Sequence, residues 1–374
     1  MSKSYADLLR EARSQIREVS PSDVERLRAS DDAAIVDVRE AAEWEQGHVP
    51  GAIHLSKSYL EQYVEGAIAD RSRPVVLYCA GGVRSLFAAQ ILAQMGYTDV
   101  ASMAGGFQRW KTQGLDWTVP PVLTADQKQR YSRHLLIPEV GLEGQARLLD
   151  SKVLIVGAGG LGSPAALYLA SAGVGTLTIC DNDAVDLTNL QRQIVHRNDS
   201  IGSPKAESAR RTLAAINPEV TVNALVERIA GARLELLVLE SDIVLDCSDN
   251  FTTRHAINRA CVAHRKPLVS GAGVRFDGQI AVFDLRDTQS PCYHCLFPEH
   301  GDNEDMPCAV MGVFAPLTGI IGSMQAAEAL KLLAGIGASL AGRLLLLDAL
   351  AMEWHTVRLK RDPACVACGT RGTS

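Results

Sequence analysis

The stretch that decides the fold covers residues 153–162 and reads VLIVGAGGLG. An apolar strand, a glycine-rich turn and an uncharged helix in this order are typical of a dinucleotide-binding fold. Gly157 allows the tight turn, Gly159 lets the backbone approach a phosphate, and Gly162 lets the helix pack close to the strand. Gly160 belongs to the same turn. The helix that follows offers free N–H groups to an anion, so the stretch predicts a nucleotide site rather than a purely structural turn.

An acidic residue and two cations follow this loop. A second apolar strand ends at Asp181, 19 residues after Gly162, where a carboxylate can hold a ribose hydroxyl. Arg192 and Lys205 come next. A hydride-transfer enzyme has no need of cations here, whereas an enzyme that breaks the α–β bond of ATP must stabilise negative charge on the leaving pyrophosphate. The pattern therefore favours ATP over a nicotinamide cofactor.

The composition fits an α/β protein with two or three domains. The chain has 374 residues, of which 47% are hydrophobic and only 5% aromatic. Its net charge of −6 gives no positive surface for nucleic acid or an anionic membrane. The first residues lack the apolar segment of a signal peptide, and the uncharged residues 153–180 are expected to be a buried core rather than a membrane span. Nine cysteines, in CxxC pairs and single positions, fit a reducing cytoplasm better than a disulfide framework.

A proline-marked segment near residue 120 divides the chain. We expect a first domain over residues 15–117, a linker over 118–124 and a second domain over 125–374. Strand and helix patterns alternate in both, which predicts an α/β fold with a small parallel sheet first and a larger Rossmann-like sheet second. In the first domain, strands are expected at 33–38, 75–79 and 99–103, and helices at 40–46 and 85–95. In the second, further strands are expected at 220–226, 243–246, 267–270, 279–284 and 343–348, and helices at 204–216, 253–263 and 316–333.

A reactive cysteine is predicted in the first domain. The strand at residues 75–78 runs directly into the loop CAGGVR, which begins at Cys79 and ends at Arg84. Backbone N–H groups around a cysteine in such a loop, together with the dipole of the next helix, stabilise a thiolate or a persulfide. Arg84 adds positive charge. The alternative is an inert thiol at a strand end, and the two glycines and the arginine argue against it.

Three further segments of this domain resemble the rhodanese family. They read IVDVRE at 35–40, GHVPGAI at 47–53 and MAGGF at 103–107, with Glu43, Trp44 and Trp110 beside them. Together with the loop from Cys79 to Arg84, the resemblance covers residues 15–117. It implies a small rhodanese-like sulfurtransferase fold in which Cys79 carries sulfane sulfur as a persulfide. It also implies structural rather than catalytic roles for Asp37 and Arg39.

Two CxxC pairs in the second domain indicate a metal site. The first pair is Cys292 and Cys295, and the second, about 70 residues later, is Cys365 and Cys368. Four thiolates from two such pairs suit tetrahedral Zn²⁺ with no open position, so the site should be structural. His294 is then a bystander. A redox pair or an attached haem would need a different sequence context.

The second domain is similar to the ubiquitin-activating superfamily over residues 125–370, in particular to the branch of molybdopterin-synthase and thiazole-pathway adenylyltransferases. The resemblance rests on RYSR at 130–133, the loop from Gly157, Asp181, the run from Thr188 to Arg192, Lys205, DCSDN at 246–250 and the CxxC pairs. It implies ATP-dependent adenylation of the C-terminal glycine of a small ubiquitin-like sulfur-carrier protein that ends in Gly-Gly.

The same resemblance implies roles for individual residues. Asp181 would hold the ribose, and Asp249 would organise Mg²⁺. Asn189, Arg192 and Lys205 would bind the phosphates of ATP. Thr188 and Asn250 are expected in the same nucleotide-binding set as Gly157, Gly159, Gly160 and Gly162. A homodimer is implied as well, in which Arg133 of one subunit reaches the nucleotide of the other.

Two questions stay open at this point. Cys308 lies in a polar stretch at 299–311, where related enzymes can use a cysteine for a covalent link to the carrier, and an inert loop thiol is the alternative. The rhodanese-like module precedes the adenylating domain, whereas it follows that domain in the two-domain eukaryotic relatives. Cys79 can therefore serve either its own chain or the sister subunit.

These observations predict a bifunctional enzyme. The carboxylate of the carrier attacks the α-phosphorus of Mg·ATP to form an acyl-adenylate, and the Cys79 persulfide then delivers sulfur, which makes a thiocarboxylate and releases AMP. We expect the small subunit of molybdopterin synthase as the carrier, and a cysteine desulfurase or thiosulfate as the sulfur donor. The alternatives are an NAD-dependent oxidoreductase fused to a sulfurtransferase module and a non-catalytic, zinc-stapled protein that docks the carrier. Arg192, Lys205 and Asp249 argue against the docking protein, because docking needs no phosphate clamp.

Overall fold

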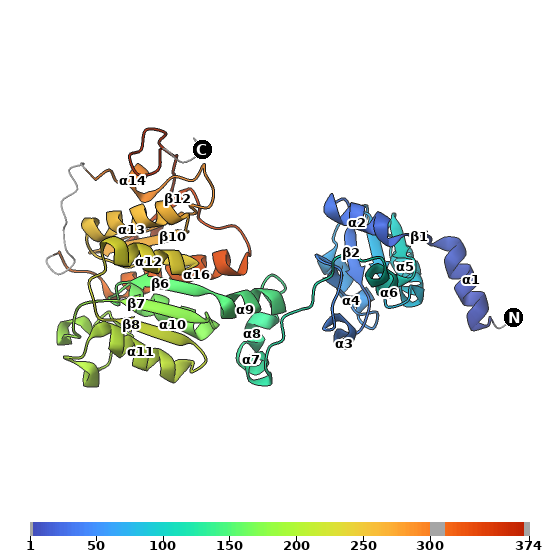
Figure 1. Ribbon diagram of the computed structural model, residues 1–374, viewed down its shortest axis with the longest axis horizontal. Coiled ribbons are helices and arrows are strands. Elements are labelled where there is room, and N and C mark those ends of the chain that lie inside the picture. Colours follow the sequence, from blue (N-terminus) through green and yellow to red (C-terminus); the bar gives the residue numbers. More distant parts are fainter. Residues whose placement is uncertain (1–2, 300–310, 370–374) are drawn as a thin grey trace. The chain divides into compact units, whose positions relative to one another are not determined.

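The computed structural model describes residues 3–299 and 311–369 (Figure 1). Two compact units divide the chain between Val122 and Leu123. Each has its own sheet and its own hydrophobic core. The two units are described separately below.

The first unit is a five-stranded parallel sheet with helices on both faces. The strand order is β1-β5-β4-β2-β3. Along β4, the side chains of Val75 and Leu77 enter one hydrophobic cluster and those of Val76 and Tyr78 enter another, because successive side chains of a strand point to opposite faces. The strands are β1 Arg17–Val19, β2 Ala34–Asp37, β3 Ile53–His54, β4 Val75–Tyr78 and β5 Val100–Met103. The helices are α1 Tyr5–Gln15, α2 Pro21–Ala29, α3 Ala41–Trp44, α4 Leu60–Ala67, α5 Val83–Gln94 and α6 Gly106–Thr112.

The second unit is built on an eight-stranded mixed sheet in the order β13-β12-β11-β10-β9-β6-β7-β8. The five neighbouring strands β10, β9, β6, β7 and β8 are parallel. On the other side of β10, the strands β11, β12 and β13 extend the sheet in antiparallel pairs. Their bounds are β6 Lys152–Val156, β7 Thr176–Cys180, β8 Thr221–Leu225, β9 Ile243–Asp246, β10 Leu268–Val274, β11 Asp277–Phe283, β12 Arg343–Asp348 and β13 Glu353–Arg358.

Helices of the second unit surround this sheet. They are α7 Ala125–Arg130, α8 Ser132–Leu135, α9 Gly141–Asp150, α10 Gly162–Ala172, α11 Lys205–Ile216, α12 Gly231–Glu240, α13 Phe251–His264, α14 Tyr293–Leu296 and α16 Ala315–Ala334. Two short 3₁₀ turns, Leu187–Asn189 and Asn198–Ser200, lie between β7 and α11. The sequence did not predict β13, whose six residues are all exposed and show no apolar alternation.

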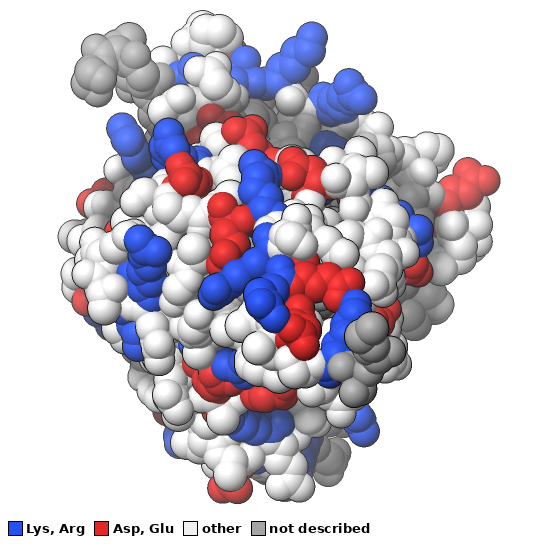
Figure 2. Space-filling model, turned by 90° about the vertical axis from the view of Figure 1, so that its right-hand side faces the viewer, with Lys and Arg blue, Asp and Glu red and all other residues white. Residues whose placement is uncertain are grey.

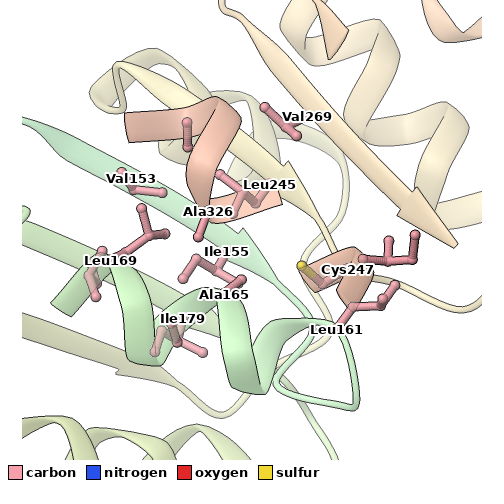
Figure 3. Packing of buried hydrophobic residues seen from close by; sticks show 14 of the residues in the cluster. Val153, Ile155, Leu161, Ala165, Leu169, Ile179, Leu245, Cys247, Val269 and Ala326 are labelled. Carbon is pink, nitrogen blue, oxygen red and sulfur yellow. The ribbon is translucent and has the colours of Figure 1, made fainter. Parts of the chain in front are cut away.

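The core of the second unit lies on both faces of its central strands. Figure 3 shows Val153 and Ile155 of β6 beside Leu169 of α10, with Ala326 of α16 on the same side of the sheet. Leu154 and Val156 face the opposite cluster, to which α12 and α13 contribute. The uncharged stretch 153–180 thus folds as β6, α10 and β7 inside this core. None of the described helices is long and apolar enough to cross a membrane.

The charged side chains are distributed without a broad single-sign area on the face shown in Figure 2. Basic and acidic residues are interspersed across that face. A nucleic-acid-binding face would present a basic patch or stripe instead.

Candidate functional site

A cavity of about 890 Å³ opens at the carboxyl ends of the parallel strands of the second unit. This edge is where open α/β sheets bind their ligands. Its wall combines the glycine-rich loop with residues far apart in the sequence. They include Gly157, Gly159, Gly160, Asp181, Arg192, Lys205, Asp249 and Asn250. The fold therefore brings most of the predicted nucleotide-binding residues together.

The glycine-rich loop is shaped by contacts that exclude side chains. Gly157 has φ +100°, and a Cβ there would lie 2.6 Å from the carbonyl oxygen of Cys247. A Cβ on Gly162 would lie 1.9 Å from the carbonyl oxygen of Gly157. Both positions therefore require glycine for the turn and for the close packing of helix on strand. At Gly159 the nearest atom to a Cβ would be Gln193 Nε2, 3.8 Å away, so the loop leaves room on its cavity side.

Asp181 follows β7 and is tied to the glycine-rich loop. Its Oδ2 accepts a hydrogen bond from the N–H of Ala158 at 2.8 Å, and its Oδ1 accepts one from the N–H of Asp183 at 2.8 Å. Each carboxylate oxygen has a second lone pair. Asp181 is therefore held in place by the backbone and can still accept hydrogen bonds from a ligand hydroxyl.

The two predicted cations differ in how they are held. Lys205 begins α11, is only 7% exposed, and places Nζ 2.8 Å from Oδ2 of Asp183. A buried ammonium of this kind needs a paired carboxylate or an anionic ligand. Arg192 is tied more weakly, since its Nη1 donates to the carbonyl oxygen of Thr188 at 3.3 Å. Both line the cavity, and together they supply positive charge to the wall that also contains the glycine-rich loop.

Thr188 and Asn189 lie beside the cavity rather than in its wall. Asp186 caps the 3₁₀ turn that contains them, and its Oδ1 accepts hydrogen bonds from the N–H and the hydroxyl of Thr188 at 2.8 and 2.6 Å. The side chain of Asn189 accepts from the N–H of Asp186 at 3.1 Å. Both side chains thus shape the turn that presents Arg192.

Asp249 and Asn250 follow β9, at the edge where β6 also ends. Asn250 is the N-cap of α13 and accepts from the N–H of Thr253 at 2.9 Å. Arg254, a buried cation that the sequence analysis missed, donates to the carbonyl oxygens of Ser248 and Gly271 at 2.7 and 3.1 Å. Arg254 therefore fixes the backbone that carries Asp249. Its position eight residues after the acidic end of β9, Asp246, is the signal that could have revealed it.

A second arm of the cavity continues along the antiparallel part of the sheet. It is lined by Gly273 and Val274 of β10, Gly278 of β11, Asp348 of β12 and His355 of β13. A Cβ on Gly278 would lie 2.8 Å from Leu317 and 2.9 Å from Ile321, two buried residues of α16, so this position requires glycine because α16 packs closely on β11. Sequence reasoning missed this arm because strand pairing creates it.

Cys79 lies at the end of β4 in the first unit, 1% exposed. The N–H of Gly82 points at its Sγ from 3.1 Å, and the hydroxyl of Ser85 lies 3.6 Å from the same sulfur. Arg84 pairs with Glu43 through two bonds of 2.6 Å. The predicted loop thus encloses the sulfur with backbone and side-chain donors.

Asp37 and Arg39 form a buried ion pair in the same unit, with Nη2 of Arg39 2.6 Å from Oδ2 of Asp37. The same Nη2 donates to the carbonyl oxygen of Gly47 at 2.7 Å. The pair therefore anchors the segment after α3 to β2, which is a structural role.

The four predicted metal-binding cysteines form one cluster. Their sulfur atoms all lie within 4.8 Å of one another, with separations of 3.9, 3.8 and 3.5 Å for three of the pairs. Four sulfurs around a tetrahedral Zn²⁺ at about 2.3 Å would lie about 3.8 Å apart, so the donor set fits this ion. Hydrogen bonding to Cys292 lowers the pKa of Cys295, which favours a thiolate at that position. His294 approaches Cys365 Sγ only from 3.5 Å, outside the four-sulfur set.

Two predicted residues do not join these sites. Arg133 is exposed on α8 and is not part of the cavity wall. Cys308 lies outside the described residues.

Family models match both units of the chain. The model of the ThiF family matches residues 131–367, and that of the rhodanese-like domain matches residues 20–113. The molybdopterin-synthase adenylyltransferase of Escherichia coli K12 is 46% identical over 247 residues, which is 66% of this chain and 98% of that protein. The SAMP-activating enzyme E1 of Haloferax volcanii is 47% identical over 251 residues, 67% of this chain and 92% of that protein.

A two-function relative and a solved structure complete the comparison. The adenylyltransferase and sulfurtransferase MOCS3 of Sus scrofa is 44% identical over 68% of this chain, which spans 56% of that protein. The crystal structure of E. coli MccB with AMPCPP and MccA has a TM-score of 0.56 at 25% identity, covering 66% of this chain and 77% of that one. The glycine-rich loop, the cations and three of the four clustered cysteines lie within the matched residues 131–367, and Cys368 directly follows them. The chain therefore belongs to the ThiF family, and it carries a rhodanese-like domain before the domain of that family.

Proposed function

We propose that this chain adenylates the C-terminal glycine of a ubiquitin-like sulfur-carrier protein and then supplies sulfur from a persulfide on Cys79. One observation carries the proposal: a single cavity is lined both by the glycine-rich loop with Arg192 and Lys205 and by Gly273, Val274 and Gly278 of the antiparallel strands. A nucleotide would occupy the first part, and the Gly-Gly tail of a carrier would occupy the second. The relatives bear the names of adenylyltransferases and an activating enzyme, which supports this function over an NAD-dependent oxidoreductase or a docking protein.

ATP would occupy the cradle as follows. The N–H groups at the start of α10 face the phosphates, and Asp181 accepts hydrogen bonds from the ribose. Arg192 and Lys205 stabilise the charge that develops on pyrophosphate. Lys205 is already paired with Asp183, so a phosphate oxygen would share or replace that carboxylate. Asp249 would hold Mg²⁺, because hard divalent cations prefer carboxylate oxygens. Thr188, Asn189 and Asn250 would act by shaping the turns next to the nucleotide.

The carrier carboxylate would attack the α-phosphorus, pyrophosphate would leave, and an acyl-adenylate would form. The outer sulfur of the Cys79 persulfide would then attack the acyl carbon and displace AMP, which leaves the carrier joined to Cys79 through two sulfurs. A second thiol cleaves that disulfide, releasing the thiocarboxylate and taking Cys79 into a new disulfide. Cys308 is a candidate for this thiol. A cellular dithiol would reduce that disulfide and free the Cys79 thiol, and a cysteine desulfurase or thiosulfate would then reload Cys79 with sulfur.

The remaining parts of the proposal concern assembly and location. Residues 15–117 would be the sulfurtransferase module, 118–124 the linker and 125–374 the adenylating module. Arg133 is exposed, as expected of a residue that reaches the nucleotide of a second subunit in a homodimer. Cys292, Cys295, Cys365 and Cys368 would hold a structural Zn²⁺. Eight described cysteines without a disulfide fit a reducing cytoplasm.

The experiment combines the full chain, Mg·ATP and a panel of candidate carriers, with the small subunit of molybdopterin synthase as the first choice. Carrier-dependent exchange of labelled pyrophosphate into ATP would report adenylation. Intact carrier mass would report sulfur transfer as a gain of about 16 Da, since sulfur replaces oxygen at the acyl carbon. Absence of exchange with every carrier, together with turnover of a nicotinamide, would contradict the proposal.

A further inference from the structure

Asn258 is a fully buried polar residue in the middle of α13. It belongs to the buried face of that helix, together with His255 three residues earlier. The centroid of the His255 ring lies 5.4 Å from that of Tyr293 and 5.7 Å from that of His294. Residues three apart on a helix lie on the same face. This face of α13 therefore packs against the CxxC turn that begins at Cys292.

The side-chain amide of Asn258 has two partners on this turn. Its Oδ1 accepts a hydrogen bond from the backbone N–H of Tyr293 at 2.9 Å, and its Nδ2 donates to Sγ of Cys292 at 3.7 Å. A backbone N–H can only donate, so the amide atom beside Tyr293 must be the oxygen. The amide nitrogen then faces the sulfur. The two partners together fix the orientation of the amide.

The sulfur that receives this hydrogen bond belongs to the cysteine cluster. Cys292 is fully buried, and its Sγ lies 3.9 Å from that of Cys295 and 3.8 Å from that of Cys365. Four thiolates around one Zn²⁺ carry a net negative charge, and burying a charge is unfavourable unless hydrogen-bond donors face it. Donors next to metal ligands also orient the ligands and raise the affinity for the metal.

Two other donors to the cluster come from the segments that carry the cysteines. The N–H of Asp362 donates to Sγ of Cys295 at 3.5 Å, and Nδ1 of His294 lies 3.5 Å from Sγ of Cys365. Asn258 differs from both, because it lies on α13, which packs into the core of the second unit through other residues of the same helix. Its amide therefore joins the cluster to a helix of the core.

We infer that Asn258 is a positioning residue of the metal site, which donates to the Cys292 thiolate and holds the first CxxC turn on α13. This inference rests on the metal site proposed for Cys292, Cys295, Cys365 and Cys368. Loss of the donor leaves more negative charge on the metal-bound thiolate and frees the turn from the helix. The affinity for the metal should then fall about tenfold or more.

The first measurement is the release of zinc from the full chain to an excess of a chromogenic chelator at pH 8. Asn258→Leu removes both hydrogen bonds. Asn258→Asp keeps an acceptor for the N–H of Tyr293 but places a carboxylate, which has no proton to donate at this pH, beside the sulfur. Both variants should release zinc about tenfold faster than the wild type, or more.

The second measurement is the absorption spectrum of the full chain produced in a medium that supplies Co²⁺ in place of zinc. Thiolate ligands give sulfur-to-cobalt charge-transfer bands, and the energy of these bands falls when a sulfur loses a hydrogen-bond donor. The bands should therefore move to longer wavelength in both variants. A role limited to bracing the backbone would not move them in Asn258→Asp, because that variant keeps the acceptor for Tyr293.

Asn217→Leu is the matched control. Asn217 is also buried, and it braces the same unit by donating to the hydroxyl of Tyr131 at 2.9 Å and to the carbonyl oxygen of Ala170 at 2.8 Å. This variant should lower the melting temperature but keep the zinc release and the cobalt spectrum of the wild type.

Two results would overturn the inference and leave the metal site in place: wild-type zinc release and spectrum in Asn258→Asp, or equally fast release from Asn217→Leu, which would assign the effect to stability alone. A folded wild type that contains no zinc would instead remove the metal site on which the inference rests.

Discussion

The Cys79 loop and the glycine-rich loop at the cavity of the second unit are built on the same local architecture and differ in what the turn encloses. In both, a parallel strand ends in a glycine-containing turn and a helix begins at once, β4 to α5 and β6 to α10. The first turn closes on a sulfur of its own chain, and Cys79 is 1% exposed. The second opens on a cavity of about 890 Å³. The same motif thus encloses a single sulfur in one unit and opens on a cavity lined by many residues in the other.

This comparison predicts that the activity of the first unit depends on one sulfur atom, whereas the activity of the second unit depends on several residues together. Cys79→Ala removes the nucleophile, so it should abolish thiosulfate:cyanide sulfurtransfer and the formation of carrier thiocarboxylate. Carrier-dependent pyrophosphate exchange should stay nearly unchanged, because its residues lie after residue 125. Full thiocarboxylate formation by this variant, with no free sulfide supplied, would show that the first unit is not the sulfur source.

Substitutions of the phosphate cations should have the next largest effect. Arg192→Ala or Lys205→Ala removes a donor that acts as charge moves onto pyrophosphate, and a loss of about 100-fold in exchange rate is expected. Sulfurtransfer to cyanide should be unaffected. Arg210→Ala is the control, since Arg210 lies on the same helix as Lys205 and pairs with Glu207 at the surface. Exchange near the wild-type rate in both cavity variants would remove these residues from the site.

The cysteine cluster should affect stability rather than the chemistry of either site. Cys365→Ser should lose the metal and lower the melting temperature of the second unit, since the binding energy of a structural zinc is also folding energy. Elemental analysis of the wild type should find about one zinc per chain. Val366→Ser, at an exposed position inside the same CxxC pair, is the control. A folded wild type without metal would contradict the assignment.

The smallest expected effect concerns the buried His196. Its Nδ1 and Nε2 pair with Ser208 Oγ at 3.0 Å and with the carbonyl oxygen of Ala158 at 2.9 Å, and burial lowers its pKa below 6.5. The unfolded chain therefore binds a proton at higher pH than the folded chain. Stability should be complete above about pH 6.5 and should decline as the pH falls below it.

Urea unfolding between pH 5 and 8 measures this contribution. His196→Gln should reduce the loss of stability that occurs as the pH falls below about 6.5. It should also lower stability at pH 7, because the hydrogen bonds of His196 that join the glycine-rich loop to α11 are lost. His255 is also buried, with its pKa lowered by burial, and the part of the decline that remains would come from groups of this kind. An unchanged slope in His196→Gln would assign the whole decline elsewhere.

The features that depend on local geometry could be predicted from the sequence. Gly157 and Gly162 are required by contacts within the turn itself, and Cys79 and Arg84 belong to one loop, so both sites could be placed from short stretches. The cysteine cluster was predictable for another reason: four cysteines in two CxxC pairs allow few alternatives.

The parts that depend on strand pairing or on neighbours could not be predicted. The arm lined by Gly273 and Gly278 exists only because β10 and β11 pair with the register Gly273↔Gly278. Asn189 was expected at the phosphates and Thr188 in the nucleotide-binding set, and the cap formed by Asp186, which engages both side chains, could not be read from the sequence. The role expected of Arg133, contact with the nucleotide of a second subunit, depends on a second chain, and the structure contains one chain.

The cysteine cluster has a topological consequence. It joins a segment just after β11 to one just after β13, and about 70 residues lie between the two CxxC pairs. A bound ion would close these residues into a loop, which restricts the unfolded chain as a disulfide does and is worth on the order of 4 kcal/mol by chain entropy. In a compartment that reduces disulfides, a metal can supply this cross-link. The helix α16 and the strands β12 and β13 would then be retained or lost with the zinc supply of the cell.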